Sequence, residues 1–353
     1  MNLSVMLKPA SGSCNLRCTY CFYHSLSGMR ESYFKGMMSY ELLDDIISKA
    51  LAFTGEDRLY LSFQGGEPLV RGKEFFEHVG RALQGKKNAH LVIQTNGTLI
   101  DDEWCDIFKK YGFLIGLSLD GTREGNACRI KADGSPAFDD IMRGVGLLKS
   151  RGIPFNILTV LTKNVVNGIA DVYAFYRAQG FKFLQFIPCL KPLDGQPYDE
   201  ASYPSELEYE IFLKKLFSCY LADIKAGRYT SIRQFDNFVR LAHGEVAEQC
   251  GMNGYCSHQF VIEADGTVYP CDFYCLDEYA MGNIADSDFE KLSRHPIAVE
   301  FIKESLKSDA ECKKCEYRRM CSGGCKRERI DVAKCKAYKR FFDYAMPDLI
   351  NLY

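Results

Sequence analysis

Sixteen cysteines in a chain of 353 residues constrain this protein more than any other feature of its sequence. Disulfide frameworks are typical of small secreted domains, whereas a chain of this length can bury a core large enough to fold without them. Most of the cysteines form two groups, one near each end of the chain. The sequence therefore predicts that thiolates hold metal in a reducing compartment.

The amino terminus from Met1 to Pro9 contains no apolar stretch of signal-peptide length. No later segment reaches the roughly 18 to 20 unbroken apolar residues that a membrane helix needs. We therefore expect a cytoplasmic protein without a membrane partner. The 44 Lys and Arg against 46 Asp and Glu give a formal charge of −2, so we expect no nucleic-acid partner either.

Six short β-branched or aromatic runs alternate with stretches whose apolar residues recur at helical spacing. The predicted strands are Leu3–Leu7, Leu59–Phe63, Leu91–Gln94, Leu114–Leu119, Phe155–Leu161 and Phe183–Ile187. The predicted helices are Tyr40–Phe53, Gly72–Gln84, Asp101–Tyr111, Phe138–Arg151 and Val166–Ala178. This alternation predicts an α/β fold of parallel βα units, and six strands favour an open partial barrel. A doubly wound open sheet is the alternative that counting strands does not separate.

Changes in composition predict three regions along the chain. Residues 1–190 form the predicted barrel, residues 191–245 a connecting region with a helix at Ser205–Lys225, and residues 246–353 a cysteine-rich domain. Within the last region, the runs 260–263 and 267–269 surround Asp265-Gly266 and predict a hairpin.

The first cysteine group directly follows the first predicted strand. Cys14, Cys18 and Cys21 have the spacing C-x3-C-x2-C with no fourth cysteine nearby. An iron-sulfur cube held by three thiolates leaves one iron open to a small chelating molecule. A zinc site that uses the neighbouring His24 is the alternative.

This motif resembles the cluster loop of the radical S-adenosylmethionine (SAM) superfamily. The resemblance implies a partial (β/α)6 barrel, a [4Fe-4S] cluster that binds SAM, and a 5′-deoxyadenosyl radical. It also implies cofactor-binding positions at the ends of the next strands, namely Gly65, Gly66, Glu67, Asn96, Ser118 and Asp120, and at Arg143 on the helix after the fourth strand. Without the resemblance, these positions read as ordinary strand-to-helix turns and, for Arg143, as a solvated helix side chain.

The second cysteine group contains eight members, which divide into two sets of four. Two closed four-thiolate sites follow, either iron-sulfur clusters or structural zinc sites. The segment resembles the SPASM extension of radical SAM enzymes, and this implies two auxiliary [4Fe-4S] clusters with interleaved ligands. One set is Cys250, Cys256, Cys271 and Cys325, and the other is Cys312, Cys315, Cys321 and Cys335.

Several segments resemble one family more closely, the anaerobic sulfatase-maturating enzymes. They are the runs around Lys8-Pro9-Ala10-Ser11, Thr19–His24, Phe63–Pro68, Cys250–Cys256 and Val268–Tyr274. The resemblance implies oxidation of a Cys or Ser in a sulfatase polypeptide to Cα-formylglycine, through abstraction of a Cβ hydrogen atom. It also implies that Asp272 accepts the proton and that Tyr23 and Gln64 lie near the substrate. Their alternative interpretations are a turn carboxylate, a packing residue and a hydrogen bonder at the sheet end.

The family's partners are a sulfatase substrate and an electron donor such as flavodoxin or ferredoxin. One segment departs from the family pattern, because Thr122–Arg129 lacks the Pro and His that commonly follow Asp120-Gly121. This departure bears on the identity of the target rather than on the radical chemistry. The alternatives are a SPASM enzyme that makes thioether, carbon-carbon or epimerised products on a ribosomal peptide, and a zinc-stabilised binding module.

Overall fold

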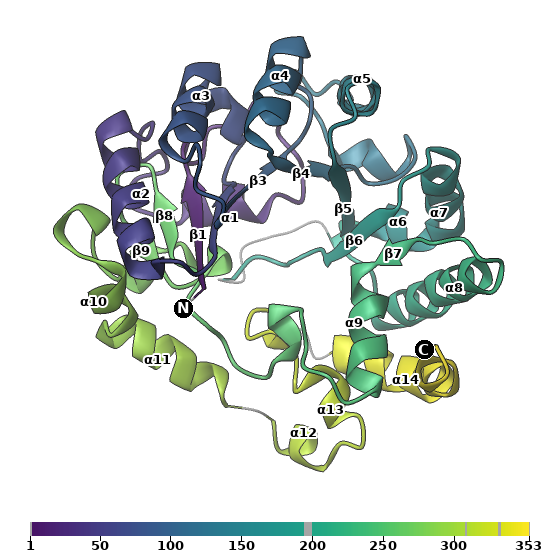
Figure 1. Cartoon of the computed structure of the whole chain (residues 1–353). Coiled ribbons are helices and arrows are strands. Elements are labelled where there is room, and N and C mark those ends of the chain that lie inside the picture. Colours follow the sequence, from purple (N-terminus) through teal and green to yellow (C-terminus); the bar gives the residue numbers. More distant parts are fainter. Residues whose placement is uncertain (1, 194–199, 308, 331–332, 353) are drawn as a thin grey trace. The chain divides into compact units, whose positions relative to one another are not determined.

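Buried strands alternate with helices along the chain in the computed structural model, which describes residues 2–193, 200–307, 309–330 and 333–352 (Figure 1). The chain forms two compact parts. The first part contains residues 1–118, 129–155 and 258–301, and the second contains residues 119–128, 156–257 and 302–353. The predicted connector at 191–203 lies partly outside the described residues. The predicted domain boundaries at residues 190 and 245 stay a prediction.

All six predicted strands are confirmed to within two residues. They are β1 (Leu3–Lys8), β2 (Leu59–Phe63), β3 (Ala89–Thr95), β4 (Leu114–Ser118), β5 (Phe155–Leu161) and β6 (Phe183–Pro188). Their apolar side chains form the core. In β2, for example, Leu59, Leu61 and Phe63 are fully buried while Tyr60 and Ser62 between them are not.

The first part contains the strand order β9-β8-β1-β2-β3-β4. The predicted hairpin is confirmed as β8 (Val261–Glu263) and β9 (Val268–Tyr269), an antiparallel pair. What the sequence did not predict is that β8 pairs in parallel with β1, which sets Glu263 level with Lys8. Leu7 is in turn level with Phe63 of β2. The carboxyl ends of β1, β2 and β8 therefore meet at one edge of the sheet, where ligand sites of such sheets gather.

Four predicted helices of the first part are confirmed, and adjacent ones pack side by side in chain order (Figure 1). They are α2 (Tyr40–Thr54), α3 (Lys73–Ala82), α4 (Asp102–Tyr111) and α5 (Phe138–Ser150). The part also contains the unpredicted helices α1 (Phe22–Gly28) and α10 (Phe289–Ser293), and the unpredicted helix α11 (Pro296–Ser305) begins in it. Asp101 caps α4 by accepting from the Trp104 amide, and Gly112 ends it in the left-handed conformation.

The second part contains the parallel strands β5, β6 and β7 (Ser231–Ile232). The stretch predicted as one helix over 166–178 is two, α6 (Lys163–Asn167) and α7 (Ile169–Ala178), because the chain breaks at Gly168. Helix α8 (Glu206–Lys225) is confirmed and begins with a capping box between Ser205 and Glu208.

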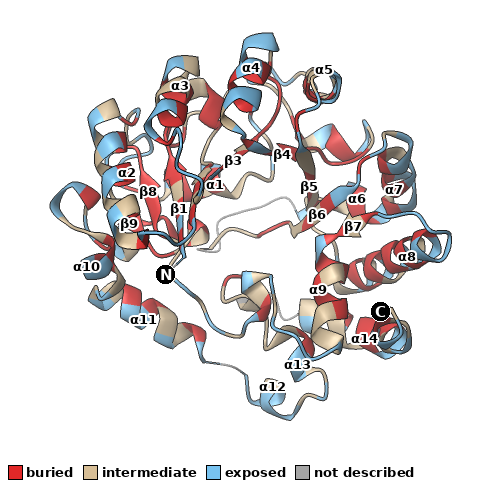
Figure 2. Cartoon of the chain, viewed as in Figure 1, coloured by how far each residue is buried: buried red, intermediate tan, exposed pale blue. Residues whose placement is uncertain are grey.

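Helices that the sequence did not predict complete the second part. They are α9 (Arg233–Ala242), α12 (Ala310–Lys314), α13 (Arg318–Cys321) and α14 (Ala333–Ile350). Aromatic side chains join α8, α9 and α14: the ring of Phe341 lies 5.5 Å from Phe217 and 5.8 Å from Phe235. Figure 2 shows the continuous buried face that α8 contributes to this core.

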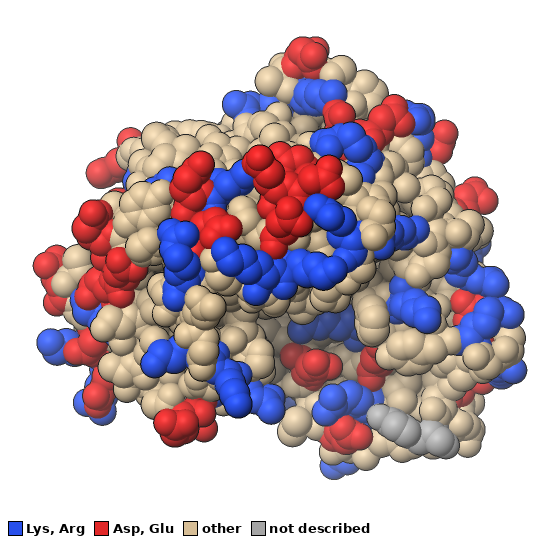
Figure 3. Space-filling view, turned by 45° about the horizontal axis from the view of Figure 1, so that its top comes forward, with Lys and Arg blue, Asp and Glu red and all other residues tan. Residues whose placement is uncertain are grey.

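Two surface properties bear on the predictions. Over the described residues, no helix combines the length and the apolar character that crossing a bilayer requires. On the face shown in Figure 3, basic and acidic side chains are interspersed, in keeping with the nearly neutral composition.

Candidate functional site

The loop that follows β1 contains the three amino-terminal cysteines. Cys14, Cys18 and Cys21 are all half-buried free thiols, and the amide of Cys21 donates to the Cys18 carbonyl at 3.1 Å. Burial, followed by the nearby charge of Glu67, raises the pKa of Cys14 to about 12.

The end of β2 packs directly against this cysteine loop. The amides of Gly66 and Glu67 donate to the carbonyls of Ser11 and Ser13 at 2.9 and 2.8 Å. A Cβ atom on Gly66 would lie 2.0 Å from the Ser13 carbonyl oxygen, so only glycine allows this approach. Gly65 has a φ of +124°, which also favours glycine. The sequence-predicted segment thus fixes the shape of the loop that precedes Cys14.

Glu67 is a buried carboxylate that joins the ends of β2 and β3. It accepts hydrogen bonds from Thr95 Oγ1 and the Asn96 amide, both at 2.7 Å, and from the Leu69 amide at 3.1 Å. Burial outweighs these bonds and raises the pKa of Glu67 to about 7. Its side chain therefore serves the backbone around Asn96, and its predicted role in cofactor binding stays a prediction.

Asn96, a predicted cofactor-binding residue, lies against the cysteine loop. Its Nδ2 atom donates to Asn15 Oδ1 at 2.9 Å and lies 4.0 Å from Cys14 Sγ. Thr98 Oγ1 donates to Asn96 Oδ1 and accepts from Asn15 Nδ2, each at 2.7 Å. This closed set of bonds fixes the Asn96 amide beside the first thiol.

The remaining predicted cofactor residues have other neighbours. Arg143 donates to the carbonyls of Thr98 and Ile100 at 2.6 and 2.7 Å, so it supports the loop after β3. Ser118 is buried at the end of β4. Asp120, in the second part, accepts from the Val160 amide at 2.8 Å. Whether Ser118, Asp120 and Arg143 also contact a cofactor stays a prediction.

The predicted proton acceptor, Asp272, forms an ion pair that the sequence did not predict. Lys8 Nζ donates to Asp272 Oδ1 at 2.5 Å, across 264 positions of sequence. Burial disfavours the Lys8 ammonium, but attraction to Asp272, Cys275 and Glu263 outweighs it and raises the pKa of Lys8. The only available signal was a charged residue at the end of an apolar strand, and nothing in the sequence identified its partner.

A second pair of buried charges, Arg30 and Glu263, lies beside the first. Arg30 donates to Glu263 Oε1 at 2.7 Å and to the Cys275 carbonyl at 2.5 Å. Tyr23 donates its hydroxyl to the same Glu263 oxygen, and Lys8 Nζ lies 3.9 Å from the centre of its ring. We call Lys8, Arg30, Glu263 and Asp272 the buried charge cluster. Its two cations and two anions sum to zero, as burial requires.

The two predicted substrate contacts differ in their surroundings. Tyr23 is 3% exposed and packs in an apolar cluster with Val261, Tyr269 and Cys275. Gln64 is half-buried at the end of β2, where its backbone amide donates to the Leu7 carbonyl. Tyr23 therefore has a structural role in the first part, and contact of either residue with substrate stays a prediction.

One predicted auxiliary set lines a single cavity in the second part. Cys312, Cys315, Cys321 and Cys335 are among the residues that line a cavity of about 310 Å³. Four thiolates are a donor set that fits an iron-sulfur cluster. The same cavity is lined by five cations and three acids, namely Lys307, Arg318, Arg329, Lys334, Lys339, Asp309, Glu311 and Glu328.

Three members of the other auxiliary set also lie in the second part. Burial, followed by the neighbouring Cys256 thiol, raises the pKa of the Cys250 thiol. Burial, followed by Glu328 and the Cys250 thiol, raises the pKa of Cys325. The backbone of Gly251 packs on Cys325, since a Cβ atom there would lie 3.2 Å from the Cys325 Cβ. The fourth member, Cys271, is half-buried in the first part, directly before Asp272.

One arginine connects the loops that carry these cysteines. Arg329 donates to the carbonyls of Gly323 and Gly324, at 2.9 and 3.1 Å, between Cys321 and Cys325. It also donates to the carbonyls of Ser305 and Lys307, at 2.6 and 3.0 Å, ahead of Cys312. The sequence analysis did not identify this residue. Its planar group, with five N–H donors, suits such a convergence of carbonyls.

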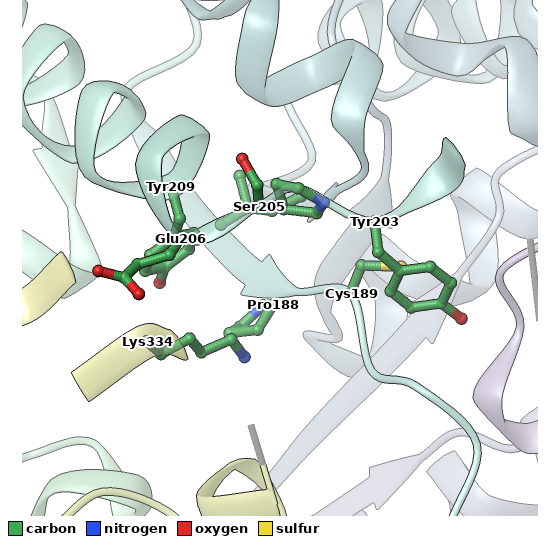
Figure 4. Close-up of a pocket in the computed structure, with 9 residues that line it drawn as sticks. Pro188, Cys189, Tyr203, Ser205, Glu206, Tyr209 and Lys334 are labelled. Atoms are coloured by element: carbon green, nitrogen blue, oxygen red, sulfur yellow. The ribbon is translucent and has the colours of Figure 1, made fainter. Parts of the chain in front are cut away.

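A smaller cavity, shown in Figure 4, lies at the carboxyl ends of β5 and β6. Its volume is about 20 Å³, and its lining includes Cys189, Tyr203, Glu206, Tyr209 and Lys334. This space is far below the several hundred Å³ of ligand pockets, so it suits a water molecule at most. Burial, followed by nearby Asp120, raises the pKa of Cys189 to about 12, as for a packed thiol.

The segment that departs from the family pattern is a compact turn. Asn126 is 1% exposed, accepts from the Asp120 amide at 3.0 Å, and donates to the carbonyls of Gly121 and Thr122 at 3.0 and 2.8 Å. A Cβ atom on Gly125 would lie 2.0 Å from the Asp120 carbonyl oxygen. The altered residues therefore build their own closed hydrogen-bond set.

Comparisons with known proteins match both cysteine-rich segments. Residues 9–175 match the family described as the radical SAM superfamily, and residues 250–316 match an iron-sulfur cluster-binding domain, SPASM. A cysteine-type anaerobic sulfatase-maturating enzyme of Clostridium novyi is 41% identical over 97% of this chain and 95% of its own. A serine-type enzyme of Bacteroides thetaiotaomicron is 28% identical over 98% of this chain and 90% of its own.

Solved structures agree with these sequence matches. A structure described as native anSMEcpe with bound AdoMet and Cp18Cys peptide is 40% identical, with a TM-score of 0.93 over 100% of this chain and 99% of that one. The partial (β/α)6 barrel with a carboxyl-terminal SPASM domain is thereby confirmed, and the doubly wound alternative is set aside. The chain therefore belongs to the radical SAM superfamily and, within it, to the anaerobic sulfatase-maturating enzymes.

Proposed function

We propose that this protein oxidises a cysteine within a sulfatase polypeptide to Cα-formylglycine. The observation that carries the proposal is the 41% identity to a cysteine-type enzyme over nearly the whole of both chains. Identity to the serine-type enzymes is lower, at 28% and 27%, which favours cysteine over serine as the oxidised residue. The three-cysteine loop and the Asp272 carboxylate give the proposal its chemistry.

The residues divide into three tasks under this proposal. Cys14, Cys18 and Cys21 hold a [4Fe-4S] cluster that binds SAM, and the eight carboxyl-terminal cysteines hold two auxiliary [4Fe-4S] clusters. When bound, these groups supply a 5′-deoxyadenosyl radical that removes a hydrogen atom, and a site that accepts one electron. The backbone amides of Gly66 and Glu67 fix the cysteine loop, and only glycine fits at position 66. Asn96, whose Nδ2 atom lies 4.0 Å from Cys14 Sγ, would contact the cofactor.

Asp272 accepts the proton in this scheme. With these groups bound, the substrate Cβ would give up one hydrogen atom, the substrate thiol would give its proton to Asp272, and an auxiliary cluster would supply the acceptor for one electron. The resulting thioaldehyde is hydrolysed by water to the aldehyde, with release of hydrogen sulfide. The position of Asp272 next to the predicted ligand Cys271 supports this assignment, because proton and electron then leave toward the same segment.

The proposal includes an electron donor and a compartment. Each cleavage of SAM consumes one electron at low potential, which suits a carrier of the flavodoxin or ferredoxin class. Eleven thiolates that must stay reduced to hold their clusters suit a reducing cytoplasm.

The test uses anaerobically reconstituted protein with SAM, dithionite and a peptide that carries a cysteine sulfatase motif. A matched peptide with serine in place of that cysteine is the control for substrate choice. We expect an aldehyde product, trapped with a hydrazine reagent and identified by mass, to form from the cysteine peptide in preference to the serine peptide. A thioether or epimerised peptide without aldehyde would instead support the alternative peptide-modifying activity.

A further inference from the structure

The structure links the cysteine loop of the first part to the segment that carries Asp272. This segment, Cys271–Cys275, is a short 3-10 turn in which the Tyr274 amide donates to the Cys271 carbonyl at 3.0 Å. A turn of this length has little internal hydrogen bonding, so outside contacts must determine where its side chains point.

Two buried cations supply those contacts at the two ends of the segment. Lys8 Nζ donates a hydrogen bond to Asp272 Oδ1 at 2.5 Å, and Arg30 Nε donates one to the Cys275 carbonyl at 2.5 Å. Lys8 is the last residue of β1, immediately ahead of the cysteine loop, and Arg30 follows α1, which begins just after Cys21. The anchors of the segment therefore flank the loop that contains Cys14, Cys18 and Cys21.

The anchors are themselves held rigidly. The Lys8 side chain is 1% exposed and the Arg30 side chain is not exposed at all. Lys8 Nζ lies over the Tyr23 ring at 3.9 Å, and Arg30 is fixed by Glu263, whose side chain is likewise fully buried. Neither cation can reach solvent as an exposed lysine would, so each presents its donors in one direction.

We propose that Lys8 and Arg30 are positioning residues that fix the orientation of the Asp272 carboxylate toward the substrate thiol. This inference rests on the proposed function. Lys8 occupies Oδ1, which leaves Oδ2 as the oxygen that receives the proton from the substrate thiol. Arg30 prevents the segment from rotating by holding its far end. Hydrogen-atom abstraction does not depend on this orientation, whereas removal of the thiol proton does.

The test measures formylglycine formed per 5′-deoxyadenosine released, because this ratio separates the two steps. In Lys8→Met we expect 5′-deoxyadenosine formation to stay within about twofold of the original, and the ratio to fall tenfold or more, the scale of a positioned base. Arg30→Met should lower the same ratio. Lys73→Met is the matched control, since Lys73 is a partly exposed lysine of the same part with two carboxylate partners, and it should leave the ratio unchanged.

Two further measurements distinguish positioning from a general loss of structure. In Lys8→Ala, added methylammonium should restore the ratio of formylglycine to 5′-deoxyadenosine, because it supplies an ammonium group in place of the missing lysine side chain. Hydrogen exchange of reconstituted Lys8→Met should speed up at residues 271–277 and stay unchanged in β3. If Lys8→Met loses iron, Lys8→Gln carries the test, because glutamine retains a donor without the charge.

The outcomes separate this inference from the proposed function. If the original protein forms 5′-deoxyadenosine but no aldehyde, the proposed function is wrong. If it forms aldehyde and Lys8→Met retains the original ratio, the positioning role is overturned while the function stands. Loss of aldehyde and 5′-deoxyadenosine in equal proportion in both Lys8→Met and Lys8→Gln would also overturn it, since the residues would then act through the whole fold.

Discussion

Glu67 makes the stability of this protein depend on pH in an unusual direction. Burial raises the pKa of Glu67 to about 7, so the folded chain binds a proton more tightly than the unfolded chain does. Where the folded state binds more protons, the free energy of unfolding falls as pH rises. The loss begins near the unfolded pKa of about 4.3 and is complete above the folded value.

Glu67→Gln should remove this dependence, because glutamine does not ionise. Between about pH 5 and about pH 8, the original protein should lose roughly 2 to 3 kcal/mol of stability relative to Glu67→Gln. Urea unfolding of both proteins across this range measures the difference. A constant difference over the range would mean that Glu67 is ionised in the fold throughout.

Glu263 is expected to dominate the stability of the buried charge cluster. Its removal leaves Arg30 buried without a carboxylate, so Glu263→Ala should lower the free energy of unfolding by about 3 to 5 kcal/mol. Glu290→Ala is the control, because Glu290 and Arg294 form a pair with side chains 64% and 77% exposed. Its removal should cost about 0 to 1 kcal/mol. If Glu263→Ala and Glu290→Ala shifted the unfolding midpoint equally, Glu263 would not dominate the stability of the buried charge cluster.

Single residues of the site were predictable by type but not by partner. The sequence predicted Asp272, Asn96 and the three cysteines as site residues because short motifs carry them, and these roles stay predictions. It missed Lys8 and Arg30, because their partners Asp272 and Glu263 lie more than 230 positions away. Spacing along the chain contains no information on contacts at that range.

At the scale of elements, the contact between the end of β2 and the cysteine loop is the one that least tolerates an added side-chain atom. Gly66→Ala would place a methyl group 2.0 Å from the Ser13 carbonyl oxygen, so the loop must move. We expect the variant to lose the amino-terminal cluster and with it all release of 5′-deoxyadenosine. The measurement is the iron content together with deoxyadenosine after addition of SAM and reductant.

Gly146 provides the matched control for this substitution. It lies in α5, and nothing lies within 4 Å of the Cβ that alanine would add. Gly146→Ala should therefore retain full iron content and gain up to about 1 kcal/mol of stability from helix propensity. If Gly66→Ala also retained the cluster, the close packing of loop and strand end would not be needed for cluster binding.

The elements themselves were largely predictable, for a physical reason. Strands such as β2 bury every second residue, and helices such as α4 have a cap at each end, so local pattern is sufficient. The pairing of β8 with β1 was not predictable, because it joins residues 255 positions apart, such as Met6 and Val261. The sequence analysis missed helix α14 because its apolar residues pack against partners on both α8 and α9, which the sequence does not reveal.

At the scale of the whole molecule, we assign one reaction to eleven cysteines and the Asp272 carboxylate. The family match and the two cysteine groups place the chain among enzymes that begin with a carbon-centred radical. What distinguishes formylglycine formation from other products of this superfamily is the atom from which the radical takes hydrogen. That atom is the Cβ of the substrate cysteine in this account.

Deuterium transfer tests this claim most directly. The substrate is the cysteine sulfatase peptide with both Cβ hydrogens replaced by deuterium, incubated with reconstituted protein, SAM and reductant in ordinary water. We expect 5′-deoxyadenosine to gain one deuterium and the aldehyde to retain the other. Unlabelled 5′-deoxyadenosine, or a product with both deuterium atoms still on Cβ, would contradict it.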